Sequence, residues 1–302
     1  MAKAFLNLGV SAVMGVIFAA CVNSLKTEEP TGTLNKIKDS GTIVLGVRES
    51  SVPFSYLDDN QKSIGYSIDL CMKVVDSVKK QLKMPNLQVK MNPVTSQTRI
   101  PLMLNGTIDL ECGSTTNTKE RQKQVAFSVA HYVTSVQMAV KANSGIKNFD
   151  DLNGKPVVTT AGTTSDRYIK QNERGGQLKV TNLYGKDHAE SFLMLESGRA
   201  VAFVMDDVLL AGLIAQSKNP KNFAIVGPAL SVEPYGLMLR KDDPQFKELV
   251  DNTLKTLMQN GEMNEIYNKW FTKPIPPKGI NLNLQMSPKL QEAFKQPTDR
   301  GI

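Results

Sequence analysis

Cysteine and histidine are scarce in this sequence. Its 302 residues include three Cys and two His, and no pair of them has the spacing of a metal site. No histidine lies close to Cys112 in the chain, so nothing indicates an activated cysteine nucleophile. The sequence also has no Gly-Lys-Ser/Thr phosphate loop. We therefore predict no metal, no cofactor, no catalytic residue and no ATP hydrolysis by this chain itself.

Aromatic residues and clustered charges are also few. The formal net charge is +7, but Lys and Arg are scattered along the chain, and aromatic residues make up only 6% of it. A nucleic-acid-binding protein would usually concentrate its basic residues in a patch or an arm, so we predict no nucleic acid as a partner. With 41% hydrophobic and 22% charged residues, the composition is typical of a globular protein with one or two domains.

One long apolar run is present, at the N-terminus. Lys3 precedes residues 4–20, which are almost entirely apolar and end in small side chains. The run is too short and too weakly flanked for a membrane span, and it is typical of an export signal. We predict a signal peptide over residues 1–20 and a flexible tether over residues 21–33.

The end of this run carries a possible modification site. Residues 18–21 (Phe-Ala-Ala-Cys) resemble the lipobox of bacterial lipoproteins, in which the cysteine, here Cys21, is acylated and becomes the mature N-terminus. Phe18 stands where that pattern prefers Leu, so cleavage without a lipid is the alternative. Two further cysteines, Cys71 and Cys112, are weak evidence for a disulfide. Because Cys71 lies at helical spacing with apolar residues, we interpret it as a small core side chain.

Alternating strands and helices follow the tether. Residues 42–47, 87–94 and 108–112 are apolar, strand-like runs. Between them lie an apolar-periodic helix over residues 68–82, with Ser67 as its N-cap, and a loop with a short helix over residues 95–105. This order indicates a parallel sheet, in which ligands bind outside the carboxyl ends of the strands. The polar residues that follow these three strands are Arg48, Ser96 with Arg99, and Ser114 with Arg121.

Residues 111–121 (Glu-Cys-Gly-Ser-Thr-Thr-Asn-Thr-Lys-Glu-Arg) form the most informative stretch. The hydroxyls of Ser114 and Thr116 can donate and accept, and the guanidinium of Arg121 matches the geometry of a carboxylate. The stretch therefore resembles a small anion site in one loop. The alternative is a polar surface loop with an exposed arginine.

A second α/β unit follows. Residues 157–160, 179–183 and 199–205 are strand-like and alternate with helical segments, and the chain then returns through residues 235–240 and two more helices. This order predicts one lobe over residues 34–133 plus 236–302 and a second over 134–235. The crossover segments 132–137 and 231–236 would act as a hinge.

Several motifs, in order, resemble a known family: the bacterial periplasmic solute-binding proteins for polar amino acids, which are capture subunits of ATP-driven importers. They cover nearly the whole chain after the signal. The matching stretches are residues 65–70 (Gly-Tyr-Ser-Ile-Asp-Leu), 105–109 (Asn-Gly-Thr-Ile-Asp), 118–121 (Thr-Lys-Glu-Arg), 127–128 (Phe-Ser), 152–157 with 162–164, 195–201, and 269–271 (Lys-Trp-Phe). The chain departs from the pattern at Ser67, where an acid is usual, and at His131, where a proline is common.

The resemblance implies a fold and a ligand. The implied fold class is α/β, a two-lobed periplasmic-binding-protein-like (type II) fold in which each lobe is a mainly parallel sheet flanked by helices and two crossover hinge strands join the lobes. Within the family, residues 48–55, 95–101, 186–188 and 205–207 are most similar to the glutamate/aspartate-binding proteins. That similarity implies that L-glutamate or L-aspartate is the ligand.

The resemblance also implies a role for each site residue. Arg121 would clamp the α-carboxylate of the ligand, and Asp206 would hold its ammonium. The side-chain carboxylate would be held by Arg48, Ser96, Arg99 and His188, while Ser114, Thr116 and Thr164 would complete the amino-acid site.

These roles agree with the chemistry of the residues. An acidic amino acid has two carboxylates and one ammonium, so its receptor needs two cationic groups and one anionic group. Asp206 could instead be only the N-cap of the next helix, but the site would otherwise lack an anion to balance its cations. His188 could be a surface or packing residue rather than a donor to the ligand.

We therefore expect a monomeric, periplasmic receptor that closes around L-glutamate or L-aspartate and delivers it to ABC permease and ATPase subunits at the inner membrane. One alternative is a periplasmic enzyme on the same fold, similar to cyclohexadienyl dehydratase. Another is a binding protein for a different polar amino acid, and a third is the ligand-sensing domain of a receptor.

Overall fold

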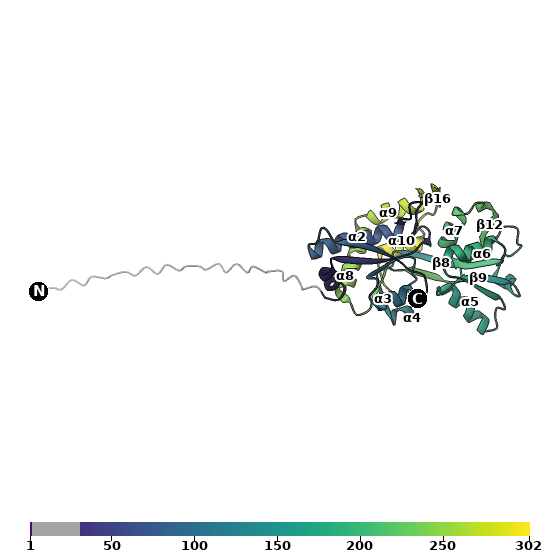
Figure 1. Ribbon diagram of the computed structural model, residues 1–302, viewed down its shortest axis with the longest axis horizontal. Coiled ribbons are helices and arrows are strands. Elements are labelled where there is room, and N and C mark those ends of the chain that lie inside the picture. Colours follow the sequence, from purple (N-terminus) through teal and green to yellow (C-terminus); the bar gives the residue numbers. More distant parts are fainter. Residues whose placement is uncertain (2–30) are drawn as a thin grey trace.

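The computed structural model describes Met1 and residues 31–302. The predicted signal peptide, most of the predicted tether and the predicted lipidation site Cys21 lie outside the described residues. The chain folds into two sheet-containing lobes, one on the left and one on the right of Figure 1. Both lobes mix helices and strands, so the predicted α/β class with two lobes is confirmed.

The first lobe is built on a five-stranded sheet with the order β5-β1-β6-β14-β7. Its strands are β1 (Thr42–Val47), β5 (Gln88–Pro93), β6 (Leu110–Cys112), β7 (Val125–Phe127) and β14 (Met238–Arg240). Strand β1 pairs in parallel with both β5 and β6, while β14 runs antiparallel to its neighbours. The carboxyl ends of β1, β5 and β6 therefore meet at one edge of the sheet, as the sequence predicted.

Helices and short strands complete this lobe. The helices are α1 (Gly32–Ser40), α2 (Tyr66–Leu82), α3 (Arg99–Leu104), α4 (Lys119–Gln122), α8 (Pro244–Gln259), α9 (Glu262–Phe271) and α10 (Pro288–Lys295). A small antiparallel sheet consists of β2 (Ser50–Ser51), β3 (Ser55–Leu57) and β4 (Ser63–Ile64), and β15 (Pro274–Ile275) pairs with β16 (Ile280–Asn281).

Two predictions about helix starts are wrong. Helix α1 begins at Gly32, inside the segment that we assigned to the tether, because Thr33 is buried and its N–H donates to the carboxylate of Asp243 over 2.8 Å. Helix α2 begins at Tyr66, so Ser67 is not its N-cap. The Ser67 hydroxyl instead donates to the carbonyl of Gly113 over 2.7 Å. This hydrogen bond connects α2 to residues 111–121, which we call the site loop.

The second lobe contains a six-stranded sheet. Its strands are β8 (Tyr132–Lys141), β9 (Pro156–Thr160), β10 (Thr181–Gly185), β11 (Ala202–Asp206), β12 (Phe223–Val226) and β13 (Val232–Tyr235). The order is β10-β9-β11-β8-β12, with β13 paired to β8, and β9 is parallel to both β10 and β11. The helices are α5 (Thr164–Arg174), α6 (His188–Glu196) and α7 (Asp207–Gln216), with 3₁₀ turns at Phe149–Leu152 and Pro220–Asn222.

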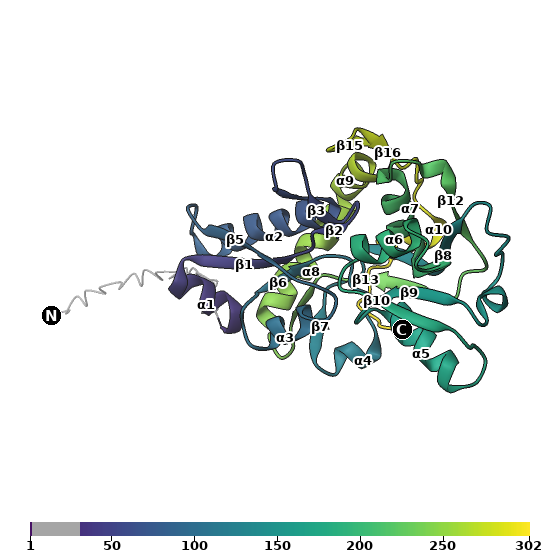
Figure 2. The ribbon, with the colours of Figure 1, turned by 45° about the vertical axis from the view of Figure 1, so that its right-hand side comes forward.

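Two strands connect the lobes. Strands β8 and β13 run antiparallel, with Tyr132 opposite Tyr235 and Ser135 opposite Val232. These are the two crossover segments predicted as the hinge. Helix α10, drawn in yellow, contacts β8 (Figure 2).

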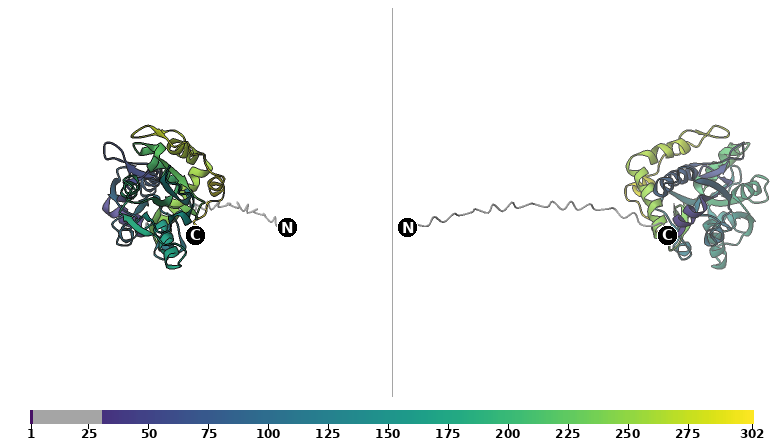
Figure 3. Two further views of the ribbon diagram at one scale, coloured as in Figure 1. Left: turned by 90° about the vertical axis from the view of Figure 1, so that its right-hand side faces the viewer. Right: turned by 60° about the vertical axis from the view of Figure 1, so that its left-hand side comes forward.

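The C-terminal segment forms backbone hydrogen bonds with the site loop. Its elements, drawn in yellow and yellow-green, lie along one side of the molecule (Figure 3). The N–H of Ile302 donates to the carbonyl of Asn117 over 3.2 Å, and the N–H of Lys119 donates to the carbonyl of Ile302 over 2.9 Å. The end of the chain therefore supports the backbone of the loop that carries Thr116 and Arg121.

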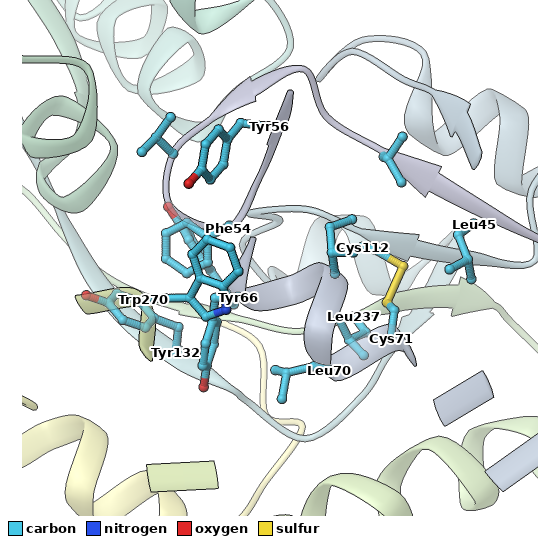
Figure 4. Close-up of a cluster of buried hydrophobic side chains, with 14 of the residues drawn as sticks. Leu45, Phe54, Tyr56, Tyr66, Leu70, Cys71, Cys112, Tyr132, Leu237 and Trp270 are labelled. Carbon is cyan, nitrogen blue, oxygen red and sulfur yellow. A yellow bond between two sulfur atoms is a disulfide. The ribbon is translucent and has the colours of Figure 1, made fainter. Parts of the chain in front are cut away.

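Aromatic side chains form the core beside the hinge (Figure 4). The ring of Phe54 lies 4.9 Å from that of Tyr132 and 5.2 Å from that of Tyr235. The ring of Trp270 lies 6.1 Å from that of Tyr56, and its indole N–H donates to Asp69 over 2.6 Å. Asp69 belongs to the family motif at residues 65–70 and Trp270 to the motif at residues 269–271, so this hydrogen bond joins the two motifs.

A disulfide links α2 to the strand that leads into the site. Cys71 and Cys112 are both fully buried and are bonded to each other. Our interpretation of Cys71 as only a small core side chain is therefore wrong. Helical periodicity reveals that a residue is buried, but it cannot reveal which distant thiol the fold places beside it.

Candidate functional site

Three arginines lie at the carboxyl edge of the first sheet. Arg48 follows β1, Arg99 begins α3, and Arg121 lies in α4 after the loop from β6. Their exposed fractions are only 1%, 2% and 5%, so the alternative of a surface loop with an exposed arginine is wrong. Burial, together with the nearby charge of Arg99, lowers the pKa of Arg48 to about 10 and of Arg121 to about 9. All three remain cationic at neutral pH.

Arg121 connects the site loop to the second lobe. Its Nη1 donates to the carbonyl of Thr116 over 2.8 Å, and its Nη2 donates to the carbonyl of Gly162 over 3.2 Å. Thr118 caps α4 by accepting the N–H of Arg121. Gly162 precedes α5, so this guanidinium lies where the two lobes meet.

His188 comes from the second lobe and contacts Arg48. It begins α6, and its Nε2 lies 3.4 Å from Nη2 of Arg48, while its Nδ1 lies 3.0 Å from the hydroxyl of Thr160. Burial lowers the pKa of His188 well below 6.5, and the charges of Arg48 and Arg99 lower it further. The imidazole is therefore neutral at physiological pH. The alternative of a surface histidine is wrong, since only 1% of it is exposed.

Arg99 is held by a short chain of hydrogen bonds. Its Nη1 donates to the hydroxyl of Thr115, and that hydroxyl donates to Oε2 of Glu111 over 2.7 Å. Glu111 is fully buried in β6. Its charge stabilises the cationic forms of Arg48 and Arg99 and partly offsets the effect of burial on their pKa values.

Asp206 ends β11 and accepts a hydrogen bond from the hydroxyl of Tyr235. Asp206 occupies the N-cap position of α7, but its side chain makes no capping hydrogen bond, so it is not only an N-cap. Burial raises the pKa of Asp206 well above its usual value, and the nearby charge of Glu233 raises it further. A cation close to Asp206 would therefore stabilise its ionised form.

Glu233 is a site residue that the sequence analysis missed. It lies in β13, is 2% exposed, and accepts hydrogen bonds from Thr116 over 2.6 Å and from Thr164 over 2.8 Å. With Glu111 it adds two buried carboxylates to the site. Our argument that the site lacks an anion other than Asp206 was therefore wrong, although the contacts of Asp206 still place it at the site.

The structure brings the nine predicted residues together. Thr164, His188 and Asp206 follow the carboxyl ends of β9, β10 and β11, three adjacent strands of the second sheet that run parallel. Eight of the nine are buried and Thr164 is partly exposed: the buried ones are Arg48, Ser96, Arg99, Ser114, Thr116, Arg121, His188 and Asp206. The two lobes approach each other closely at Gly162, where an added Cβ would lie 3.0 Å from the backbone of Ser96 and Gln97.

Several buried polar atoms of this site lack hydrogen-bond partners among the described residues. They are Nη1 of Arg48, Nε of Arg99, the hydroxyls of Ser96 and Ser114, Oδ1 of Asp206 and Oε1 of Glu111. A buried donor or acceptor left unpaired costs about 1–3 kcal/mol. A ligand with carboxylates for the arginines and serines and an ammonium for Asp206 would satisfy all of them except Oε1 of Glu111.

The residues that the sequence analysis missed gave little signal. Glu111 lies in an otherwise apolar strand, and a charge in such a strand is rarely buried unless it is paired. Glu233 and Tyr235 lie in a crossover segment, and their partners in the site, Thr116 and Asp206, are more than 25 residues away. Only the tertiary contacts identify them.

The described part of the chain contains neither a cluster of metal-ligating side chains nor a membrane-spanning helix. Residues 31–302 contain no group of three or more His, Cys, Asp or Glu side chains that could hold a metal ion. No helix within the described residues is long and apolar enough to span a membrane.

Comparisons with known proteins agree with this geometry. Residues 43–273 match the family model of the bacterial extracellular solute-binding proteins, family 3. The chain is 52% identical over 298 residues to an L-glutamate/L-aspartate-binding protein of Pseudomonas aeruginosa, covering 98% of this chain and 99% of that one. It is 51% identical over 270 residues to a glutamate/aspartate import solute-binding protein of Escherichia coli, covering 89% of each.

A solved structure is similar as well. An ancestral amino-acid-binding protein, described as a precursor of cyclohexadienyl dehydratase, superimposes with a TM-score of 0.69 at 31% identity and covers 80% of this chain and all of that one. The two-lobed fold, the family match and the similarity over nearly the full length agree. This chain belongs to the family 3 bacterial extracellular solute-binding proteins.

Proposed function

We propose that this chain is the solute-binding subunit of an ABC importer and captures L-glutamate or L-aspartate. The observation that carries the proposal is the set of three buried arginines, Arg48, Arg99 and Arg121, which supply more cationic groups than a single α-carboxylate needs. Two relatives that are more than 50% identical are named for glutamate and aspartate. The chemistry of the pocket and the names of the relatives thus agree.

The ligand would bridge the two lobes. We propose residues 34–133 plus 236–302 as one lobe and 134–235 as the other, with Gly32 and Thr33 added to the first because they lie in α1. Arg121 would bind the α-carboxylate, and Asp206 would bind the ammonium. Arg48 and Arg99, with Ser96, would bind the side-chain carboxylate. Because the contacts come from both lobes, the ligand would stabilise their closed arrangement.

The cellular setting is also a proposal. The family is one of extracellular solute-binding proteins, and the N-terminal apolar run fits export to the periplasm. There the protein would act as a monomer and deliver its ligand to a membrane permease with its ATPase subunits. Cys21 would carry a lipid anchor if the lipobox-like segment is processed as in lipoproteins.

The alternatives are less well supported. An enzyme similar to cyclohexadienyl dehydratase has one supporting observation, the solved neighbour described as a precursor of such an enzyme, but that neighbour is itself an amino-acid-binding protein. The relatives that match over most of the chain are named as binding proteins. A site for a different polar amino acid would leave buried arginine N–H groups such as Nη1 of Arg48 and Nε of Arg99 unpaired, and a buried unpaired donor costs about 1–3 kcal/mol.

Calorimetric titration tests the proposal. L-glutamate, L-aspartate, L-glutamine and L-asparagine are titrated into the mature protein, and we expect saturable binding of the two acids and much weaker binding of the two amides. In Arg99→Ala the preference for glutamate over glutamine should disappear, whereas Arg199→Ala, which removes an exposed arginine, should retain it. Equal affinities of the unmodified protein for all four ligands would contradict the proposal.

A further inference from the structure

Glu233 connects hydroxyl groups from both lobes. Its Oε2 accepts the hydroxyl of Thr116, which lies in the first lobe, and the hydroxyl of Thr164, at the start of α5 in the second lobe. Its Oε1 accepts the hydroxyl of Ser231 over 2.9 Å. Three hydroxyl groups therefore converge on one carboxylate that is 2% exposed.

The backbone holds Glu233 in this position. The N–H of Asn117 donates to the carbonyl of Pro234 over 2.8 Å, and the N–H of Gly236 donates to the carbonyl of Thr115 over 3.2 Å. The site loop thus pairs with the hinge strand on both sides of Thr116. The backbone pairing therefore places Thr116 beside Glu233, so their contact does not depend on side-chain conformation alone.

The carboxylate determines which way the hydroxyl protons point. An ionised carboxylate can only accept, whereas a threonine hydroxyl has one proton and two lone pairs. Thr116 and Thr164 both donate their single proton to Glu233. Each oxygen is then left with lone pairs only, so each can accept a hydrogen bond from a ligand but cannot donate one.

Asp206 supplies a third acceptor at the same end of the site. Its Oδ2 already accepts the hydroxyl of Tyr235, while its Oδ1 has no partner within the described residues. The charges of Asp206 and Glu233 lie close enough to affect each other and to affect Arg121. An ammonium group has three N–H donors. The two threonine oxygens and Oδ1 of Asp206 match that number.

We propose that Glu233 is a positioning residue that orients the hydroxyls of Thr116 and Thr164 as acceptors and thereby makes the site select an α-ammonium group. The inference rests on the proposed binding of glutamate and adds a cause for the rejection of acids that carry the same two carboxylates without the amine. A ligand with a keto oxygen at this position would face acceptors only, and its oxygen would have no donor.

A pair of ligands tests the inference. L-glutamate and 2-oxoglutarate have the same carbon chain and both carboxylates, but only glutamate has the ammonium. Their dissociation constants are measured by calorimetry for the unmodified protein, for Glu233→Gln and for the control Glu248→Gln, which removes an exposed carboxylate on α8. In Glu233→Gln the amide can donate, so the threonine hydroxyls are free to turn.

We expect Glu233→Gln to weaken glutamate binding by at least about tenfold and 2-oxoglutarate binding by much less. The ratio of the two constants should therefore fall, while Glu248→Gln leaves it unchanged. If Glu233 only supports the fold, both ligands should lose affinity equally and the ratio will stay constant, which would overturn the inference. Absence of glutamate binding by the unmodified protein would instead contradict the proposed function itself.

A conservative variant keeps the test valid if Glu233→Gln is poorly folded, and a double-variant cycle tests whether Glu233 acts through Thr116. Glu233→Asp shortens the side chain but keeps an acceptor-only group, so it should restore part of the preference for glutamate. In a Thr116→Val background, one of the two oriented hydroxyls is already absent, and Glu233→Gln should then reduce the ratio by a smaller factor. Equal factors in both backgrounds would show that Glu233 does not act through Thr116.

Discussion

Nη2 of Arg48 lies 3.4 Å from Nε2 of His188, and this contact joins the end of β1 in one lobe to the start of α6 in the other. A guanidinium can only donate, so Nε2 is the acceptor, and the single proton of the neutral imidazole lies on Nδ1. That proton points toward the hydroxyl of Thr160, 3.0 Å away. His188 therefore orients Arg48, and in this arrangement its ring has no proton left for a ligand carboxylate.

Replacing His188 should weaken the binding of acidic ligands. In His188→Leu, Arg48 loses the atom that accepts from its Nη2, and we expect glutamate to bind about tenfold more weakly, since a hydrogen bond to a charged group contributes about 1.5–3 kcal/mol. Glutamine should be affected less. Calorimetry with both ligands measures the difference, and an equal loss for both would rule out a specific role for His188 at the side-chain carboxylate.

The same contact makes a prediction about pH. Because burial and the two arginines hold the pKa of His188 well below 6.5, this residue stays neutral throughout the physiological range. Glutamate affinity measured between pH 6 and pH 8 should show no step near the ordinary histidine pKa. A step in that range that disappears in His188→Leu would contradict the neutral assignment.

Gly162 lies at a point where the two lobes approach each other closely. Its φ is +82°, and a Cβ at this position would lie 2.9 Å from Cγ of Gln97 and 3.0 Å from its backbone nitrogen, across the lobe boundary. In Gly162→Ala we expect glutamate to bind at least about tenfold more weakly, because the lobes cannot close fully.

Gly154→Ala is a matched control for this substitution. Gly154 also has a positive φ, +76°, but an added Cβ would meet nothing within 4 Å. Both variants should lose similar stability from backbone strain, yet only Gly162→Ala should lose affinity. Thermal unfolding and calorimetry separate the two effects, and an equal loss of affinity in the control would show that strain alone is responsible.

The disulfide between Cys71 and Cys112 should contribute strongly to stability. It closes a loop with a sequence separation of 41, for which the loop-closure estimate is about 4 kcal/mol. Cys71→Ala/Cys112→Ala should lower the free energy of unfolding by roughly that amount in urea titrations. Addition of a reductant should weaken the unmodified protein but leave the double variant unchanged. No difference between the two proteins in oxidising buffer would contradict the prediction.

His131 should reduce stability in acid. Its ring is fully buried among aromatic side chains, 5.8 Å from Tyr66, and burial lowers its pKa to about 3. The unfolded chain, with a pKa near 6.5, binds a proton below that pH while the folded protein does not, so the stability contributed by neutral His131 is lost as pH falls.

The comparison of His131→Phe with the unmodified protein isolates this effect. The difference in free energy of unfolding, variant minus unmodified, should rise by about 2 kcal/mol between pH 7 and pH 5 in favour of the variant. His188→Leu, the other histidine variant, indicates whether the second buried imidazole behaves in the same way. A difference that stays constant with pH would mean that His131 takes up its proton in the folded protein.

Part of this protein is determined by sequence alone. Apolar, β-branched runs such as Thr42–Val47 favour buried strands, and their alternation with helices favours the parallel pairing that the structure shows. Arg48, Ser96 and Ser114 follow such strands, so their convergence at one edge could be predicted. The order of the family motifs then indicated the class of ligand. The arginines agree with that class, because arginine is suited to binding carboxylates and stays charged when buried.

Other features were decided by tertiary structure. The bond between Cys71 and Cys112 and the contacts of Glu233 with Thr116 and Thr164 join residues that are 41 to 117 positions apart, and no local pattern encodes such pairs. The sequence could show that cations needed anions, but not which anions. Burial and backbone pairing determine which carboxylates are the partners, since a buried charge is stable only where the fold brings it a partner. In this fold Glu111 is linked to Arg99 through Thr115, and Glu233 lies between Thr116 and Thr164.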